Sequence, residues 1–124
     1  MQAVRHVFAD RIKFHDGDYE LAPNVTVHLA GGHSGGLQFV RVLTARGWLV
    51  LASDATHFWA NIRRRNPFPL LHNLERMMEA WLRCEELADG PDHIIPGHDP
   101  LVLARFPLVD GDPNTVRLDL PPVS

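Results

Sequence analysis

Apolar and polar residues alternate along several short segments in the first half of the chain, which is the pattern of half-buried β-strands. We predict strands over 11–14 and Val25–Leu29. A hairpin then pairs 37–43 with 48–52 across the turn 44–47, where Gly47 can supply a positive φ. The second arm, WLVLA, is apolar throughout, so we expect this strand to be covered on both faces of the sheet.

In the second half, apolar residues recur at helical spacing instead. They predict one amphipathic helix that ends near Asp89, with a core-facing stripe of Leu70, Leu74, Met77, Trp81, Cys84 and Ala88. A short buried strand follows at 93–95, and Asp99–Pro100 is typical of the N-cap and first residue of a further short helix. The turn-rich tail adds one edge strand at 115–118. These elements predict an α/β (α+β) fold with one long helix over a sheet.

The composition is that of one ordinary globular domain over residues 1–124, with 45% apolar and 22% charged residues. A net charge of −3 provides no basic field for nucleic acid, and the one dense cationic run, Arg63–Arg65, is typical of a solvated loop. No apolar run reaches the roughly 20 residues of a membrane span. The single cysteine, Cys84, excludes an internal disulfide and, without a signal-peptide pattern, favours the cytoplasm.

The stretch LAGGHSGGLQ surrounds one histidine, His33, with four glycines. Glycine permits positive φ and close backbone approaches, so we expect a tightly shaped loop here that points the imidazole at a ligand. The alternative is a flexible turn with an incidental surface histidine.

Two other polar residues, Asp54 and His98, also follow predicted strands. Because strand ends of layered α/β folds gather at one edge of the sheet, His33, Asp54 and His98 can converge on one ligand. Two imidazoles and a carboxylate are a donor set that zinc or a similar divalent ion accepts. Taken singly, Asp54 also fits a cap of the turn 55–57, and His98 a hydrogen-bonded loop histidine.

The three segments LAGGHSGGLQ, LVLASDATHF and DHIIPGHDP, in this order, closely resemble the back half of the metallo-β-lactamase fold hydrolases. The resemblance covers roughly 16–106 and is closest to the N-acyl homoserine lactonase-like branch. It implies half of an αββα sandwich, with a mixed sheet covered by one long amphipathic helix. It also implies a zinc-type centre of one or two ions, in which His33 and His98 are ligands and Asp54 bridges.

The same resemblance carries a substrate contact onto His57, because lactonase-like members place a tyrosine three residues after the bridging aspartate to contact the substrate carbonyl. The predicted site is therefore Asp54 and His57 as catalytic residues, with His33, Asp54 and His98 on the metal.

The family's front-half motif, His-x-His-x-Asp-His, does not occur in the sequence. The remaining histidines form no close cluster that could replace it, and we expect structural or surface roles for them: His6, His15, His28, His72 and His93. At most one ion is therefore expected in this chain alone, with weak activity or none. Half a sandwich also leaves one apolar sheet face uncovered, so we expect a homodimer that pairs two copies across a twofold axis.

Two functions follow from these observations. The first is a metal-dependent hydrolase acting on a small-molecule lactone or another ester, represented here by its C-terminal half. The alternative is a non-catalytic remnant that folds as a homodimer or an interaction module.

Overall fold

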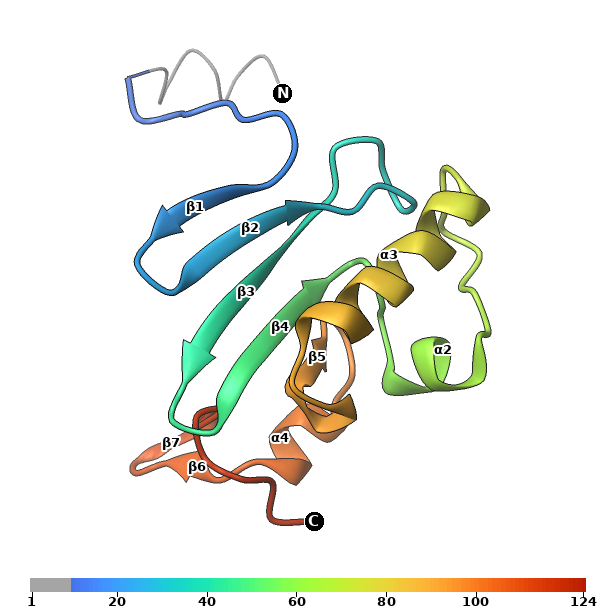
Figure 1. The fold of residues 1–124 in the computed structure, drawn as a ribbon. Coiled ribbons are helices and arrows are strands. Elements are labelled where there is room, and N and C mark those ends of the chain that lie inside the picture. The colour runs from blue at the N-terminus through green and yellow to red at the C-terminus, as the bar shows by residue number, and fades with distance from the viewer. Residues whose placement is uncertain (1–9) are drawn as a thin grey trace.

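The computed structural model describes residues 10–124, and a five-stranded mixed sheet is its central element (Figure 1). The strand order is β1-β2-β3-β4-β5, with antiparallel pairs up to β4 and a parallel pair between β4 and β5. The strands are β1 (Tyr19–Ala22), β2 (Val25–Leu29), β3 (Gln38–Thr44), β4 (Gly47–Ser53) and β5 (Ile94–Pro96). This confirms the mixed sheet, the strand at Val25–Leu29 and the predicted hairpin.

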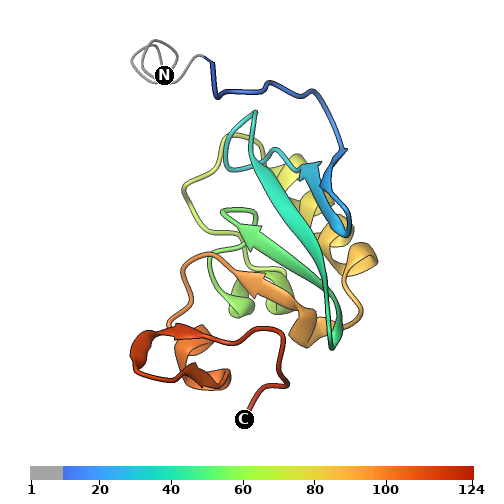
Figure 2. The same cartoon turned by 90° about the vertical axis from the view of Figure 1, so that its left-hand side faces the viewer.

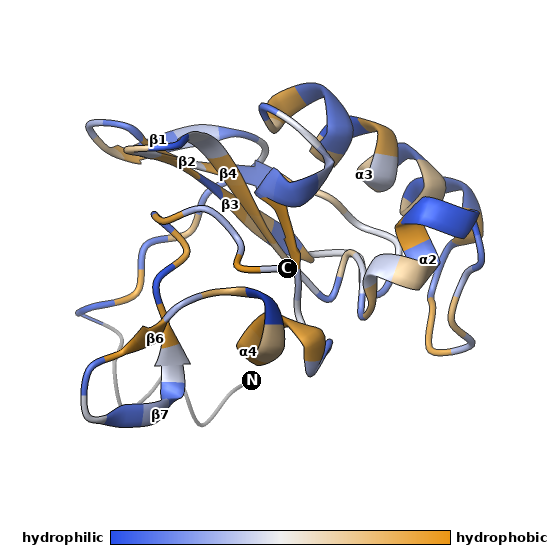
Figure 3. Ribbon diagram, turned by 90° about the horizontal axis from the view of Figure 1, so that it is seen from below, coloured by the Kyte–Doolittle hydropathy of each residue, from blue (hydrophilic) through white to orange (hydrophobic). Residues whose placement is uncertain are grey.

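Helices lie on both faces of this sheet. They are α2 (Trp59–Arg64), α3 (Leu74–Leu87) and α4 (Leu101–Arg105), with a short 3-10 helix, η1 (Pro91–His93), before β5. Figure 3, seen from below, has α3 on one side of the sheet and α4 on the other, beside a two-stranded sheet of β6 (Leu108–Val109) and β7 (Asp112–Val116). No helix of residues 10–124 is long and apolar enough to cross a membrane.

The larger part of the core lies between α3 and the sheet. Trp81 is fully buried there, and its indole N–H donates to the carbonyl of Ala55 at 2.6 Å, which ties α3 to the loop that follows β4. The same core contains Phe39, Val50, Ala52, Met77, Cys84 and Ile94. A smaller cluster on the opposite face joins Trp59, Ile95 and Phe106, so β4 and β5 are covered on both faces near the C-terminal segment. As predicted, β4 is a buried central strand.

Two predicted strands differ from the structure. No strand forms at 11–14, where Phe14 is 75% exposed; the edge position is taken by β1, which is brought next to β2 by a turn at Asn24 with φ +64°. The predicted edge strand at 115–118 is instead β7, which pairs with β6 in a separate sheet. Of the predicted strand at 115–118, only residues 115 and 116 lie in a strand.

The long helix begins later than the apolar pattern predicts, at Leu74 rather than Leu70. The side chain of Asn73 caps it by accepting from the Arg76 N–H at 2.9 Å. The preceding N–H groups of His72 and Asn73 both donate to the carbonyl of Gly32, at 2.7 and 2.9 Å. The backbone of Asn73 is extended, with φ −149° and ψ 115°, so the helix begins only after this residue.

The run Arg63–Arg65 was predicted as a solvated loop, and this is wrong for its first two residues, which end α2. Its side chains are also partly paired: Arg63 contacts Asp92 at 3.2 Å, and Arg65 contacts Glu85 at 2.7 Å. Six residues without an apolar period give too little pattern for a helix prediction, so α2 was not predicted.

Of the glycines in the LAGGHSGGLQ loop, Gly32 has the tightest surroundings. Its φ is +90°, and a Cβ there would lie 2.7 Å from the Met77 Cα in α3. Gly36, in the same loop, has open space around it. The tight bend predicted from LAGGHSGGLQ is thus a close contact between the loop and the first turn of α3.

We expect Gly32→Ala to lower the free energy of unfolding by about 2–4 kcal/mol, through backbone strain and overlap with α3. Gly36→Ala is the matched control and should change it by less than about 0.5 kcal/mol. Urea unfolding followed by tryptophan fluorescence measures both. Equal stabilities of the two variants would contradict the close contact.

Candidate metal centre

The candidate site lies where three strands end. β2, β4 and β5 run in the same direction, because β2 and β4 both pair antiparallel with β3 and β5 pairs parallel with β4. His33 follows β2, Asp54 directly follows β4, and His98 follows β5. Figure 2 shows these strand ends on the same side of the sheet. The structure therefore brings together the three residues that the sequence predicted to converge.

The Asp54 carboxylate is at the centre of the cluster. The Nε2 of His98 lies 2.6 Å from its Oδ1, and the Nε2 of His33 lies 3.8 Å from its Oδ2. The Nε2 of His57 is 3.6 Å from Oδ1. Three imidazole nitrogens thus face one carboxylate. Ligand atoms of Asp54, His57 and His98 all lie within 4.8 Å of one another, which is close enough for one metal ion to contact all three.

The loops that carry these residues are held by backbone contacts between the segments after β4 and β5. Gly97 N–H donates to the Thr56 carbonyl, and His98 N–H donates to the His57 carbonyl, both at 3.0 Å. A Cβ on Gly97 would lie 2.5 Å from the carbonyl oxygen of Ser53, so the close approach of the two loops requires glycine. Ser53 itself has a left-handed φ of +51°, which a serine adopts only under constraint.

His33 is oriented by the connector between α2 and α3. Its Nδ1 lies 2.6 Å from the carbonyl oxygen of Leu70. Because a carbonyl only accepts, Nδ1 carries the proton, and in the neutral ring Nε2 presents its lone pair to Asp54. Two electron-rich atoms facing each other are stabilised by a cation between them, which is the arrangement of a metal ligand with a hydrogen-bonded outer nitrogen.

His57 lies against Phe68 of the same connector. The two rings stack at 3.7 Å with an interplanar angle of 8°, and the His98 ring meets His57 edge-on at 4.5 Å. Burial, followed by the neighbouring His98, lowers the pKa of His57, while Asp54 opposes this. The ring is therefore held mainly in the neutral form that metals bind.

The residues present fit a divalent cation. The Nε2 of His57 is buried and has no hydrogen-bond partner, although it faces a carboxylate. A buried polar atom without a partner costs about 1–3 kcal/mol, so a cation bound between this atom and the neighbouring donors would be stabilising. Imidazole and carboxylate donors in this number suit zinc and its neighbours among the divalent transition metals.

Comparison with solved structures gives this geometry a context. Crystal structures of quorum-quenching N-acyl homoserine lactone hydrolases match the chain at 30% identity and a TM-score of 0.64, over 71% of this chain and 36–37% of theirs. One of them holds the product N-hexanoyl-L-homoserine at its catalytic metal centre, and a mutant of B. thuringiensis AiiA with N-decanoyl-L-homoserine at its active site matches equally well. No protein-family model and no curated protein matches the chain.

The chain has a partial metallo-β-lactamase fold. It spans about a third of the length of the lactonase structures that it matches. This confirms the resemblance drawn from the three sequence segments and the predicted fold class, with α3 as the long helix over the mixed sheet.

Within this partial metallo-β-lactamase fold, the other described histidines lie away from the cluster. His28 bonds to Thr26 at 2.8 Å and to Asp18 at 2.9 Å, and His93 bonds to the Arg46 carbonyl at 2.9 Å. His15 stacks on Tyr19, and His72 is exposed. His6 lies outside the described residues. Among residues 10–124, the histidine cluster is the one group with metal-ligand spacing.

Sequence reasoning missed the connector that orients the histidines. The segment Asn66–Pro69 was predicted only as a stiff link, yet Phe68 and the Leu70 carbonyl fix two rings of the site. The proline pair around Phe68 was the available signal, because prolines limit the conformations of a loop. Nothing in the sequence indicates which ring Phe68 contacts.

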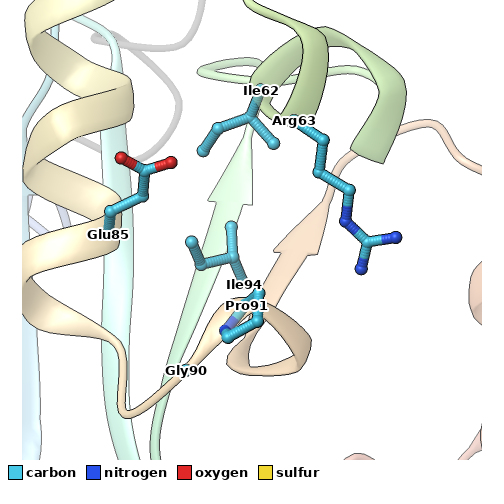
Figure 4. A pocket seen from close by; sticks show the side chains of 6 residues that line it. All are labelled: Ile62, Arg63, Glu85, Gly90, Pro91 and Ile94. Atoms are coloured by element: carbon cyan, nitrogen blue, oxygen red, sulfur yellow. The ribbon is translucent and has the colours of Figure 1, made fainter.

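Among the cavities of the described residues, one lies beside this site and another lies apart from it. A groove of about 430 Å³ runs over the sheet face opposite α3 and reaches Ser53, Pro96 and Gly97 beside the cluster. Another cavity, of about 270 Å³, lies between α2, α3 and η1, and its lining includes no residue of the cluster around Asp54 (Figure 4). The charged residues on its rim, Arg63 and Glu85, are already paired with Asp92 and Arg65.

We expect neutral His33 in the metal-free protein to carry its proton on Nδ1, because the Leu70 carbonyl accepts it. Long-range ¹H–¹⁵N NMR of the imidazole rings at alkaline pH distinguishes the two tautomers, with the exposed His72 as the unconstrained reference. A proton found on Nε2 of His33 would contradict the orientation described above.

Proposed function

We propose that the chain is the metal-binding part of a metal-dependent hydrolase that opens a lactone or cleaves another carboxylic ester. The observation that carries the proposal is the convergence of His33 and His98 on the Asp54 carboxylate, at 3.8 and 2.6 Å, in a chain 30% identical over 71% of its length to lactone hydrolases. Hydrolysis adds one water across the acyl C–O bond and gives a carboxylate and a hydroxyl.

The residues of the site divide into those that bind a metal ion and those that support them. Asp54, His33 and His98 are the proposed ligands, and a divalent ion held there supplies Lewis-acid polarisation of an ester carbonyl. The Leu70 carbonyl orients His33, and the Phe68 ring keeps water from one face of His57. Asp99 accepts from the N–H groups of Trp59 and Leu101, both at 3.0 Å, and so anchors the loop that carries His98.

The ligands present support one ion. Because the chain spans about a third of the matching lactonases, we propose that full activity requires protein groups beyond these 124 residues. The isolated chain is then a metal-binding protein with little or no hydrolytic activity.

We expect zinc to raise the melting temperature of the chain by roughly 10 °C when its concentration exceeds Kd about 100-fold, from about 2.7 kcal/mol of binding linkage. His33→Ala combined with His98→Ala should abolish this rise, whereas His72→Ala, at an exposed histidine, should preserve it. Differential scanning calorimetry with and without metal measures the effect.

Metal analysis after reconstitution with zinc, manganese, iron or cobalt, and a lactone assay alone and with a front-half protein, complete the test. If none of these ions binds, the metal assignment is wrong. The remaining function is then the alternative, a folded module without chemistry.

We also propose that two copies of the chain associate through the open sheet face, defined as the groove formed by Tyr19, Val27, Val40, Leu51 and Ile95. These side chains project from the sheet opposite α3. Tyr19, Val40 and Leu51 are partly exposed, whereas Val27 and Ile95 are only 5% and 6% exposed. The C-terminal segment covers only the part of this face next to Phe106, Val116 and Leu118. An apolar face of this kind is typical of an interface.

We expect the chain to sediment as a dimer at micromolar concentration, and Val40→Glu to shift it to a monomer, because the charge would be buried at the interface. Leu82→Glu is the matched control, since Leu82 is 59% exposed on α3 and lies outside this face. Sedimentation velocity measures both variants. A wild-type monomer at these concentrations would rule out the dimer.

A further inference from the structure

We propose that His57 is itself a metal ligand, together with Asp54 and His98, and is not the contact to the substrate carbonyl that its sequence position implies. This inference rests on the proposed function, because it assigns a role within the same metal centre. It makes the segment from Asp54 to His57, together with His98, the minimal ion-binding unit of the chain.

The first argument is the direction of the His57 ring. Its Nε2 faces Asp54 Oδ1 at 3.6 Å, the oxygen that the His98 Nε2 approaches to 2.6 Å. A residue that contacts a substrate carbonyl must present a donor to open space. The Nε2 of His57, the nitrogen farther from the backbone, is instead directed into the donor cluster.

The second argument is the accessibility of that nitrogen. Nε2 is buried and unpaired, and the side chain as a whole is only 14% exposed. In comparison, the His98 side chain is 56% exposed and already bonded to Asp54. Of the imidazoles around Asp54, His57 is thus the one whose inward nitrogen has the greatest need of a partner.

The third argument is the rigidity of the ring. Phe68 stacks on one face at 3.7 Å, the His98 ring lies at its edge at 4.5 Å, and the His57 carbonyl accepts from the His98 N–H. Rotating the side chain outward would break the stack and expose Phe68, which is 7% exposed. The packing therefore holds Nε2 in place for a ligand role, as preorganised metal sites require.

Asp54, His57 and His98 together also offer enough donor atoms for one chain to hold a metal ion. Two imidazoles and one carboxylate bind zinc, cobalt or ferrous iron with further positions open. His33, whose Nε2 lies 3.8 Å from Asp54 Oδ2, is an additional donor next to these three residues. The isolated chain thus offers more ligands to one ion than the family correspondence alone assigns to it.

Titration with Co²⁺, followed by its visible absorption, tests the role of His57. Wild type should take up one Co²⁺, and His57→Phe should raise Kd by at least about 100-fold and change the absorption bands, because a ligand is lost while the ring stacked on Phe68 is kept. His72→Phe is the matched control and should bind as wild type. Far-UV circular dichroism without metal checks that each variant is folded.

The outcomes separate the two proposals. If wild type binds no Co²⁺, the metal-dependent function itself is wrong. If wild type binds and His57→Phe binds with the same Kd and spectrum, His57 is not a ligand, whereas the proposed function stands.

A measurement on the wild type covers the case in which His57→Phe does not fold. Adding Zn²⁺ should shift the ¹⁵N resonances of both His57 Nε2 and His98 Nε2. A His57 resonance that stays unchanged while the His98 resonance shifts would overturn the inference.

Discussion

The parallel pairing of β5 with β4 is the constraint on which the site depends. Residues 54 and 98 lie far apart in the sequence, and they meet because Leu51 pairs with Ile95 and Ser53 with Pro96 at the ends of these strands. The pairing continues beyond the sheet as two backbone hydrogen bonds between the following loops, to Thr56 and His57. The main chain thus brings Asp54, His57 and His98 together, and the stack on Phe68 fixes the direction of the His57 ring.

The remaining support comes from the helical side of the sheet. Trp81 of α3 holds the Ala55 carbonyl, and the first turn of α3 packs against Gly32 in the loop that carries His33. One helix thus contacts two of the loops that form the site. Loss of its packing would disturb the metal centre as well as the core, which links the stability of the domain to the geometry of the cluster.

The sequence predicted the framework of this arrangement well. Alternation identified β2 and the β3–β4 hairpin, and the strand-end positions of His33, Asp54 and His98 predicted that they converge. Ring directions were not predictable, because they depend on Phe68 and the Leu70 carbonyl, in a connector without periodicity. The same limit explains why the start of α3 was placed too early: an apolar stripe cannot reveal that Asn73 has an extended backbone and caps the helix.

The left-handed backbone conformation of Ser53 affects which substitutions would stabilise this chain. Glycine or asparagine would occupy a φ of +51° at lower conformational cost, so a search for thermal tolerance alone would be drawn to this position. The residue immediately after it supplies the carboxylate to which every imidazole of the cluster is directed. Relaxing position 53 would therefore trade a gain in melting temperature against a wider spread of carboxylate positions, as in enzymes whose durability and turnover are in conflict.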